Sequence, residues 1–182
     1  MHQQAAAALR GLAVTFSNKM KIVQEGALNP ISHLLLSQDV EILREVVACL
    51  CNLSVSDENK LEIMSSGVSP PLITLTQHSD MLIASQACAT LANLAEIRSN
   101  QNVLVDDGAI RQTITVMRSR HIAVQRESGR LLANLCASES THTDVIVQEG
   151  GHNLLISYLL SHDTACQRVG ALGVCNLATK QK

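Results

Sequence analysis

Apolar and polar positions alternate along the chain with the period of amphipathic helices. In the segment 81–95 the apolar side chains recur at steps of three and four residues, at Ile83, Ala87, Leu91 and Leu94. This spacing places them on one face of a helix and therefore predicts a helix with one buried side.

Two shorter helices are predicted before this one. The first is an amphipathic turn that Asn59 caps and Gly67 ends. The second starts at Pro70 and Pro71, because proline in the first turn of a helix gives up no hydrogen bond. A polar break at 77–80 then separates the second helix from the longer third one.

The three-helix pattern recurs along the chain. An asparagine column stands at Asn52, Asn93, Asn134 and Asn176, with spacings of 41, 41 and 42 residues. A glycine column with the same three spacings stands at Gly26, Gly67, Gly108 and Gly150. Two columns that share one single-residue insertion indicate repeated structural units. The predicted units are 18–58, 59–99, 100–141 and 142–182, and residues 1–17 supply only the third helix of an earlier unit.

These units resemble the armadillo repeat over nearly the whole chain. The resemblance is carried by Gly-Ala-Leu or Gly-Ala-Ile between the first two helices, at 26–28 and 108–110, and by Leu-x-Asn-Leu near the end of the third. It implies one all-α domain, 1–182, built as a right-handed α-solenoid of stacked helix triplets. Gly11 breaks the asparagine column at the first, partial unit. Because neither end carries a polar cap, we expect a segment of a longer array, or a truncated product, that can self-associate through its ends.

Composition and charge exclude some classes of protein and favour others. The 182 residues are 46% hydrophobic but only 1% aromatic, so aliphatic side chains must close the core. With 14 Lys and Arg against 16 Asp and Glu, the formal net charge of −2 argues against nucleic-acid binding. The six cysteines lie in apolar stretches, which indicates a reducing compartment, cytoplasmic or nuclear. The sequence has no apolar run long enough to form a transmembrane segment.

Candidate catalytic residues are sparse. His162 and Asp163 precede Cys166, but Cys166 occupies an apolar repeat position, which favours a core thiol beside a surface histidine. Cys49 and Cys51 lack a second pair that would complete a zinc site. The sequence contains no P-loop, dinucleotide fingerprint or Gly-x-Ser-x-Gly motif. We therefore expect no enzymatic activity and no cofactor or metal.

The asparagine column has two interpretations. Third helices line the concave surface of armadillo proteins, so the resemblance places these amides in a groove. There each amide could bond the backbone of an extended peptide, at about 0.5–1.5 kcal/mol per bond. In the alternative, each Asn ties down a loop at its own helix end or bonds the next repeat. Both interpretations stay open.

Partner specificity would come from neighbouring columns of the third helices. Eight residues before each Asn stand Arg44, Ser85, Arg126 and Arg168. Seven before stand Glu45, Gln86, Glu127 and Val169, and four before stand Ala48, Ala89, Arg130 and Leu172. The candidate partner-binding residues are the four asparagines together with Arg44, Arg126, Arg130 and Arg168.

Arg126 and Arg130 make unit 100–141 the most basic part of the expected groove. They lie one helical turn apart, and two guanidinium groups can clamp carboxylates or phosphates. An acidic partner segment near this pair is one expectation, and a solvated charged face is the other. Three further arginines are expected on other surfaces: Arg111, Arg118 and Arg120.

The columns distinguish between kinds of armadillo groove. Importin-alpha places a Trp four residues before the Asn, and this chain has no Trp, so recognition of nuclear-import signals is not expected. The pattern is more similar to beta-catenin-type grooves or to vacuolar armadillo adaptors.

The leading hypothesis is a non-catalytic scaffold or adaptor that holds an extended or helical partner segment in its concave groove. The alternative is a structural segment of a larger assembly that acts by stacking, such as a ubiquitin-ligase tail, a membrane-anchored vacuolar adaptor or an axonemal protein. A surface for nucleic acid or lipid headgroups at the arginine cluster is the third option.

Overall fold

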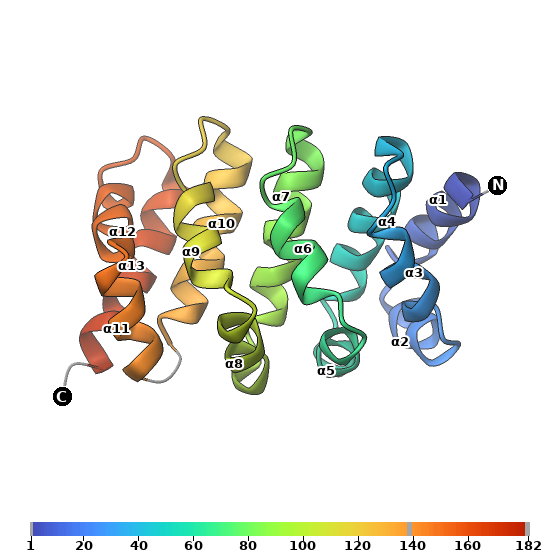
Figure 1. The fold of residues 1–182 in the computed structure, drawn as a ribbon, viewed down its shortest axis with the longest axis horizontal. Helices are drawn as coiled ribbons and strands as arrows, with labels where there is room; N and C mark the ends of the chain where they lie inside the picture. The colour runs from blue at the N-terminus through green and yellow to red at the C-terminus, as the bar shows by residue number, and fades with distance from the viewer. Residues whose placement is uncertain (1, 138–139, 181–182) are drawn as a thin grey trace.

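The helices form layers that stack along one axis of the molecule (Figure 1). The computed structural model describes residues 2–137 and 140–180, and in these ranges it contains helices and no strands. A complete layer holds a first, a second and a third helix, whereas α1 (His2–Leu12) is a lone third helix at the N-terminal end. The predicted all-α solenoid is therefore confirmed.

Each helix type occupies its own position in the stack. The first helices are α2 (Phe16–Gln24), α5 (Asp57–Ser65), α8 (Arg98–Asp106) and α11 (Ser140–Gln148). The second helices are α3 (Leu28–Leu34), α6 (Ser69–Leu75), α9 (Ala109–Val116) and α12 (Gly151–Leu159). The third helices, which pack side by side beginning with α1, are α4 (Val40–Leu53), α7 (Met81–Leu94), α10 (Ile122–Leu135) and α13 (Thr164–Lys180).

The local signals for helix ends have mixed outcomes. The four glycines of the column have φ between 77° and 88°, a left-handed conformation that favours glycine, so they end the first helices as predicted. Pro70 lies in the first turn of α6, also as predicted. The expected cap at Asn59 is wrong. Ser56 occupies the N-cap position of α5, and Asn59 is buried within that helix.

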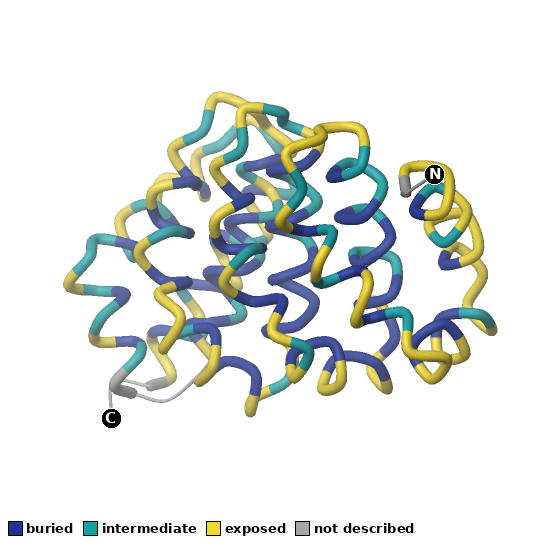
Figure 2. Tube along the Cα trace, turned by 45° about the vertical axis from the view of Figure 1, so that its right-hand side comes forward, coloured by how far each residue is buried: buried dark blue, intermediate teal, exposed yellow. Residues whose placement is uncertain are grey.

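Buried aliphatic side chains from all three helix types form the core, along the dark segments of Figure 2. The leucines of the repeated motif are buried, at Leu50, Leu53, Leu91, Leu94, Leu132 and Leu135. Each contributes about 1.5–3 kcal/mol by leaving water. Among the aromatic residues, Tyr158 is buried and Phe16 is exposed, so the core depends on aliphatic side chains as the composition predicts.

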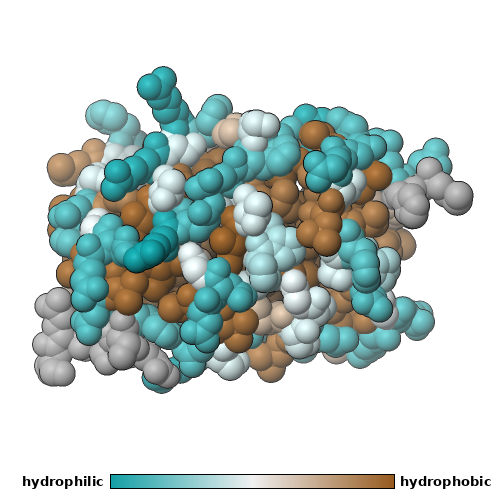
Figure 3. All heavy atoms as spheres, viewed as in Figure 1, coloured by the Kyte–Doolittle hydropathy of each residue, from teal (hydrophilic) through white to brown (hydrophobic). Residues whose placement is uncertain are grey.

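The outer surface is mixed in character. The view that faces the second helices shows hydrophilic side chains interspersed with apolar ones (Figure 3). Within the described residues, no helix combines the length and apolar character needed to cross a membrane.

Candidate functional site

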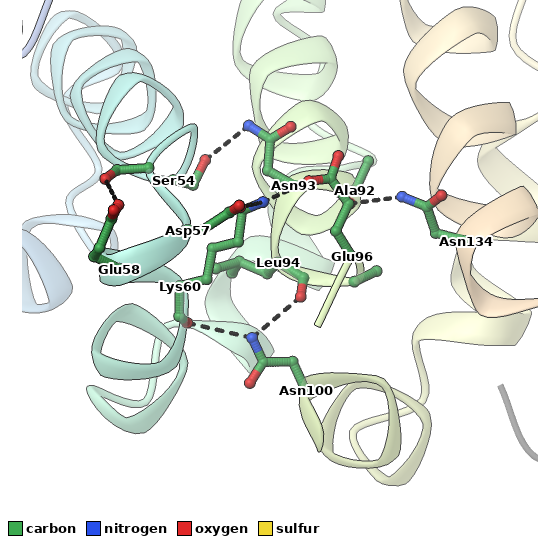
Figure 4. Close-up of polar contacts among 12 residues, drawn as sticks. Ser54, Asp57, Glu58, Lys60, Ala92, Asn93, Leu94, Glu96, Asn100 and Asn134 are labelled. Carbon is green, nitrogen blue, oxygen red and sulfur yellow. Dashed lines mark hydrogen bonds and ion pairs between the residues drawn. The ribbon is translucent and has the colours of Figure 1, made fainter. Parts of the chain in front are cut away.

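The asparagine column bonds each third helix from α4 onward to the layer before it, and Figure 4 draws these bonds for Asn93 and Asn134. The donor–acceptor pairs from Nδ2 are Asn52 to Arg10 O (3.5 Å), Asn93 to Ser54 Oγ (2.9 Å), Asn134 to Ala92 O (2.9 Å) and Asn176 to Ala133 O (2.8 Å). The interpretation in which each Asn stabilises the stack therefore fits these amides. Their N–H groups donate to the preceding layer, and Asn93 Oδ1 also accepts from Arg130 of the next layer. A role of the same amides in partner binding stays a prediction.

A second asparagine column lies on the first helices. Asn100 Nδ2 in α8 donates to Leu94 O at 3.1 Å and to Lys60 O at 3.3 Å, so it joins two helices of the preceding layer. Asn59 makes the equivalent pair of bonds one layer earlier. The sequence signal for this column is the recurrence of Asn at positions 18, 59 and 100.

Arginine–aspartate pairs connect the starts of the third helices. Arg44 Nε on α4 lies 2.9 Å from Asp80 Oδ2, and Arg126 Nε on α10 lies 3.0 Å from Asp163 Oδ1. Each aspartate also accepts backbone N–H groups at the start of the helix that follows it. Hydrogen bonding from the arginine is the main cause that lowers the pKa of each aspartate. We call each Arg–Asp pair a rung.

The rung is missing between α7 and α10. Ser85 stands at the position equivalent to Arg44, and His121 stands at the position equivalent to Asp80. His121 precedes α10, but its side chain does not cap the helix, in contrast to Asp80 before α7. The contact between α7 and α10 therefore lacks both members of the ion pair, and α10 lacks the side-chain cap at its start.

The structure does not bring Arg126 and Arg130 together as a clamp. Arg126 points toward Asp163 in the following layer. Arg130 reaches the preceding layer, where its Nη1 lies 2.8 Å from Asn93 Oδ1, and its Nη2 lies 2.9 Å from Glu127 Oε2 in its own helix. Both guanidinium groups are thus engaged within the chain, because the stacking register places acceptors beside them.

The remaining two predicted arginines lie apart from this pair. Arg44 forms the first rung at the start of α4, and Arg168 lies exposed on α13 at the other end of the stack. The eight predicted partner-binding residues are therefore spread over four third helices and do not converge on one point.

A hollow of about 360 Å³ lies on the third-helix face, where the rung is missing. Its lining comes from three consecutive third helices: Cys51, Ser85, Gln86, Ala89, Ala123, Arg126 and Glu127. These residues include members of the three columns that the sequence singles out for specificity. Small side chains such as Ala89 leave the space open, and the volume is in the range of sites that accept a ligand group.

The buried thiols show no sign of activation. Burial is the main cause that raises the pKa of Cys49 to about 11 and the pKa of Cys88 to about 12. A nucleophilic cysteine needs a lowered pKa, so these groups behave as core side chains. Cys166 is buried and His162 is exposed, as predicted. Among the described residues, no cluster of three or more His, Cys, Asp or Glu could hold a metal ion.

Restoring the missing cap is expected to stabilise the chain. We predict that His121→Asp raises the free energy of unfolding by about 1 kcal/mol, because an aspartate N-cap satisfies free N–H groups of α10. Adding Ser85→Arg completes the rung and contributes at most about 1 kcal/mol more, since the pair is at the surface. Urea unfolding of both variants measures this. Destabilisation by His121→Asp would contradict the assignment of position 121 as an uncapped helix start.

Comparisons with known proteins agree on the fold. The model of the armadillo/beta-catenin-like repeat matches residues 15–55 and 56–96. An engineered protein of a structural genomics consortium is 28% identical, with a TM-score of 0.91 over 97% of this chain and 72% of that chain. A designed armadillo repeat protein in complex with the peptide (KR)4 has a TM-score of 0.91 at 20% identity, over 97% and 75% of the two chains. No curated protein sequence matches the chain.

The likeness to armadillo proteins thus rests on two matched repeats and on a solenoid that superimposes over nearly its whole length. Armadillo folds are in general non-catalytic scaffolds, which agrees with the thiol chemistry above. Residues 15–55 and 56–96 match the armadillo/beta-catenin-like repeat, and the chain has the fold of armadillo solenoids.

Proposed function

We propose that the chain is a non-catalytic scaffold that binds a segment of a partner protein along its third-helix face. The hollow between α7 and α10 is the observation that carries this proposal, because it lies on that face and is lined by three successive third helices. The designed protein that holds (KR)4 shows that an armadillo solenoid of this shape can accept a peptide. The partner of this chain has a different chemistry, since Arg126 and the other hollow residues do not form an acidic surface.

The surroundings of the hollow favour a partner segment without strong charge at this point. Arg126 is neutralised by Asp163, and Glu127 by Arg130. The floor is formed by Ala89, Ala123 and the other small groups of the lining. An uncharged side chain of the partner fits such a site, because a charged one would lose its hydration without an opposite charge to replace it.

A peptide selection tests the proposal. We expect peptides selected from a random displayed library to bind the chain, and to bind Ser85→Arg and Ala89→Glu at least about tenfold more weakly, which is about 1.4 kcal/mol. Arg already occupies the equivalent of position 85 in the three other layers, so Ser85→Arg fills the hollow without disturbing the helix. Binding is measured by titration calorimetry with purified chain.

Asn102→Arg on α8 is the matched control. This exposed residue lies on a first helix, so the variant adds the same charge away from the third-helix face. Selected peptides that tolerate both hollow variants, or that respond equally to Asn102→Arg, would show that this face is not the binding site.

A reducing compartment is a further part of the proposal. Six free cysteines support it, and five of them are buried or half-buried. We infer a cytoplasmic or nuclear location from this chemistry.

A further inference from the structure

A second hollow lies at the edge of the stack, away from the third-helix face. It measures about 360 Å³ and is bounded by the ends of the second helices α6 and α9 and the starts of the third helices α7 and α10. Its lining residues are Thr76, Gln77, His78, Met81, Ala84, Thr115, Val116, Arg118, Ser119 and Val124. Figure 1 shows the loops between second and third helices along one edge of the molecule, and we call this the edge hollow.

Cations gather at the edge hollow and carboxylates are absent from its lining. Arg118 lines it, and Arg120 and His121 follow in the same exposed loop. Within the part of the chain that the structure describes, neither Arg118 nor Arg120 has an ion-pair or hydrogen-bond partner for its guanidinium group. The neighbouring Asp80 is already neutralised by the rung to Arg44.

This layer differs from the others at the same loop. Arg118 is equivalent to Leu36, Gln77 and Leu160 in the other layers, and Arg120 is equivalent to Gln38, Ser79 and His162. The last residue of the loop, just before the third helix, is an aspartate in the other three layers and His121 in this one. The loop has thus gained two positive charges and lost one negative charge at the layer where the rung is missing.

The neutral groups of the edge hollow add further donors. His78 Nδ1 accepts the N–H of Asp80 at 3.0 Å, so the proton of the neutral ring lies on Nε2 and can be donated. Ser119 Oγ accepts the N–H of His121 at 3.2 Å, which leaves its hydroxyl proton available. The floor is apolar, with Ala84, Val116 and Val124 buried beneath it.

We propose that the edge hollow is a second docking surface, specific for an acidic segment of a protein in which carboxylate side chains neighbour an aliphatic one. Carboxylates pair with Arg118 and Arg120, and the aliphatic side chain covers the floor. A nucleic acid fits less well, because only two arginines are unpaired here and the chain has a net charge of −2. This surface is separate from the one proposed for the scaffold function.

Fluorescence anisotropy with a labelled synthetic peptide, Glu-Leu-Glu-Glu-Leu-Glu, tests the proposal. We expect the wild-type chain to bind it, with affinity that falls as salt rises, and the variant Arg118→Glu/Arg120→Glu to bind about tenfold more weakly. The variant Lys21→Glu/Arg98→Glu makes the same change of net charge at other exposed cations and is expected to bind like the wild type. Circular dichroism checks that both variants are folded, and since all four side chains are exposed we expect them to be.

Three results would overturn the proposal. They are absence of binding by the wild-type chain, equal weakening in the two double variants, and an Arg118- and Arg120-dependent preference for a single-stranded oligonucleotide over the peptide. Ala89→Glu, which fills the hollow on the third-helix face, is expected to leave peptide binding at the edge unchanged. Failure of one surface is therefore distinguishable from failure of the other.

Discussion

Replacing Tyr158 with alanine is expected to lower the free energy of unfolding by about 3–5 kcal/mol, the cost of removing a large buried side chain. Tyr158 in α12 packs between the last two layers, and its hydroxyl donates to Met117 O at 2.9 Å. Tyr158→Phe keeps the ring and loses that bond, so we expect it to cost about 1–2 kcal/mol. Urea unfolding of the two variants measures both values. Equal losses of stability in the two variants would contradict the view that Tyr158 stabilises the chain mainly by packing.

The same residue predicts a dependence on pH. Burial is the main cause that raises the pKa of Tyr158 well above its ordinary value of 10. The folded chain therefore keeps this proton while the unfolded chain releases it, and stability falls as the pH rises above about 10. Tyr158 is the one tyrosine of the chain and there is no Trp, so near-ultraviolet absorbance of tyrosinate reports this group alone. Ionisation without loss of helical signal would contradict its burial.

Removing both carboxylates around Lys60 is expected to cost about 2 kcal/mol. Lys60 is almost wholly buried, and its Nζ lies 2.5 Å from Asp57 Oδ1 and 2.5 Å from Glu96 Oε2 (Figure 4). The double variant Asp57→Ala/Glu96→Ala leaves a buried ammonium without a partner. We expect the loss of free energy of unfolding to be smaller than for breaking a fully buried ion pair, because both carboxylates are themselves partly exposed. Chemical unfolding measures the change.

Lys60→Met separates the charge from the packing. The substitution keeps the length of the side chain, so it is expected to be nearly neutral alone and to restore stability to the double variant. Burial alone would lower the pKa of Lys60, but the hydrogen bonds to Asp57 and Glu96 outweigh it and raise the pKa. The stabilisation by this pair is therefore complete below the ordinary lysine pKa of 10.5 and is lost as the pH rises through the raised value. A triple variant as unstable as the double variant would refute this account.

Local patterns were sufficient to predict the architecture. Gly67 marks a helix end because only a residue without Cβ adopts its φ of 77° without strain, and Pro70 marks a helix start because it lacks an N–H. The third helix expected at about 81–95 is observed as Met81–Leu94. Such signals depend on a few neighbouring residues, and their recurrence every 41 residues predicts the stack.

The hydrogen-bond and ion-pair partners of the polar side chains could not be predicted in the same way. Arg126 is paired with Asp163, 37 residues away, and Asn134 bonds Ala92, 42 residues away. These partners meet because of the way successive layers stack. The side-chain contacts between layers could not be predicted from the sequence. Asn59 illustrates the same limit, since its spacing suggests a cap while stacking buries it against the preceding layer. The missing rung is visible in the sequence only after Arg44 and Asp80 are known to pair.

The most direct test of the central claim is a map of backbone amide chemical shifts on binding of a peptide selected against the wild-type chain. The scaffold function proposed above predicts that the largest changes fall in α7 and α10, at residues such as Gln86, Ala89 and Ala123 that line the hollow on the third-helix face. Changes confined to the first and second helices would contradict it.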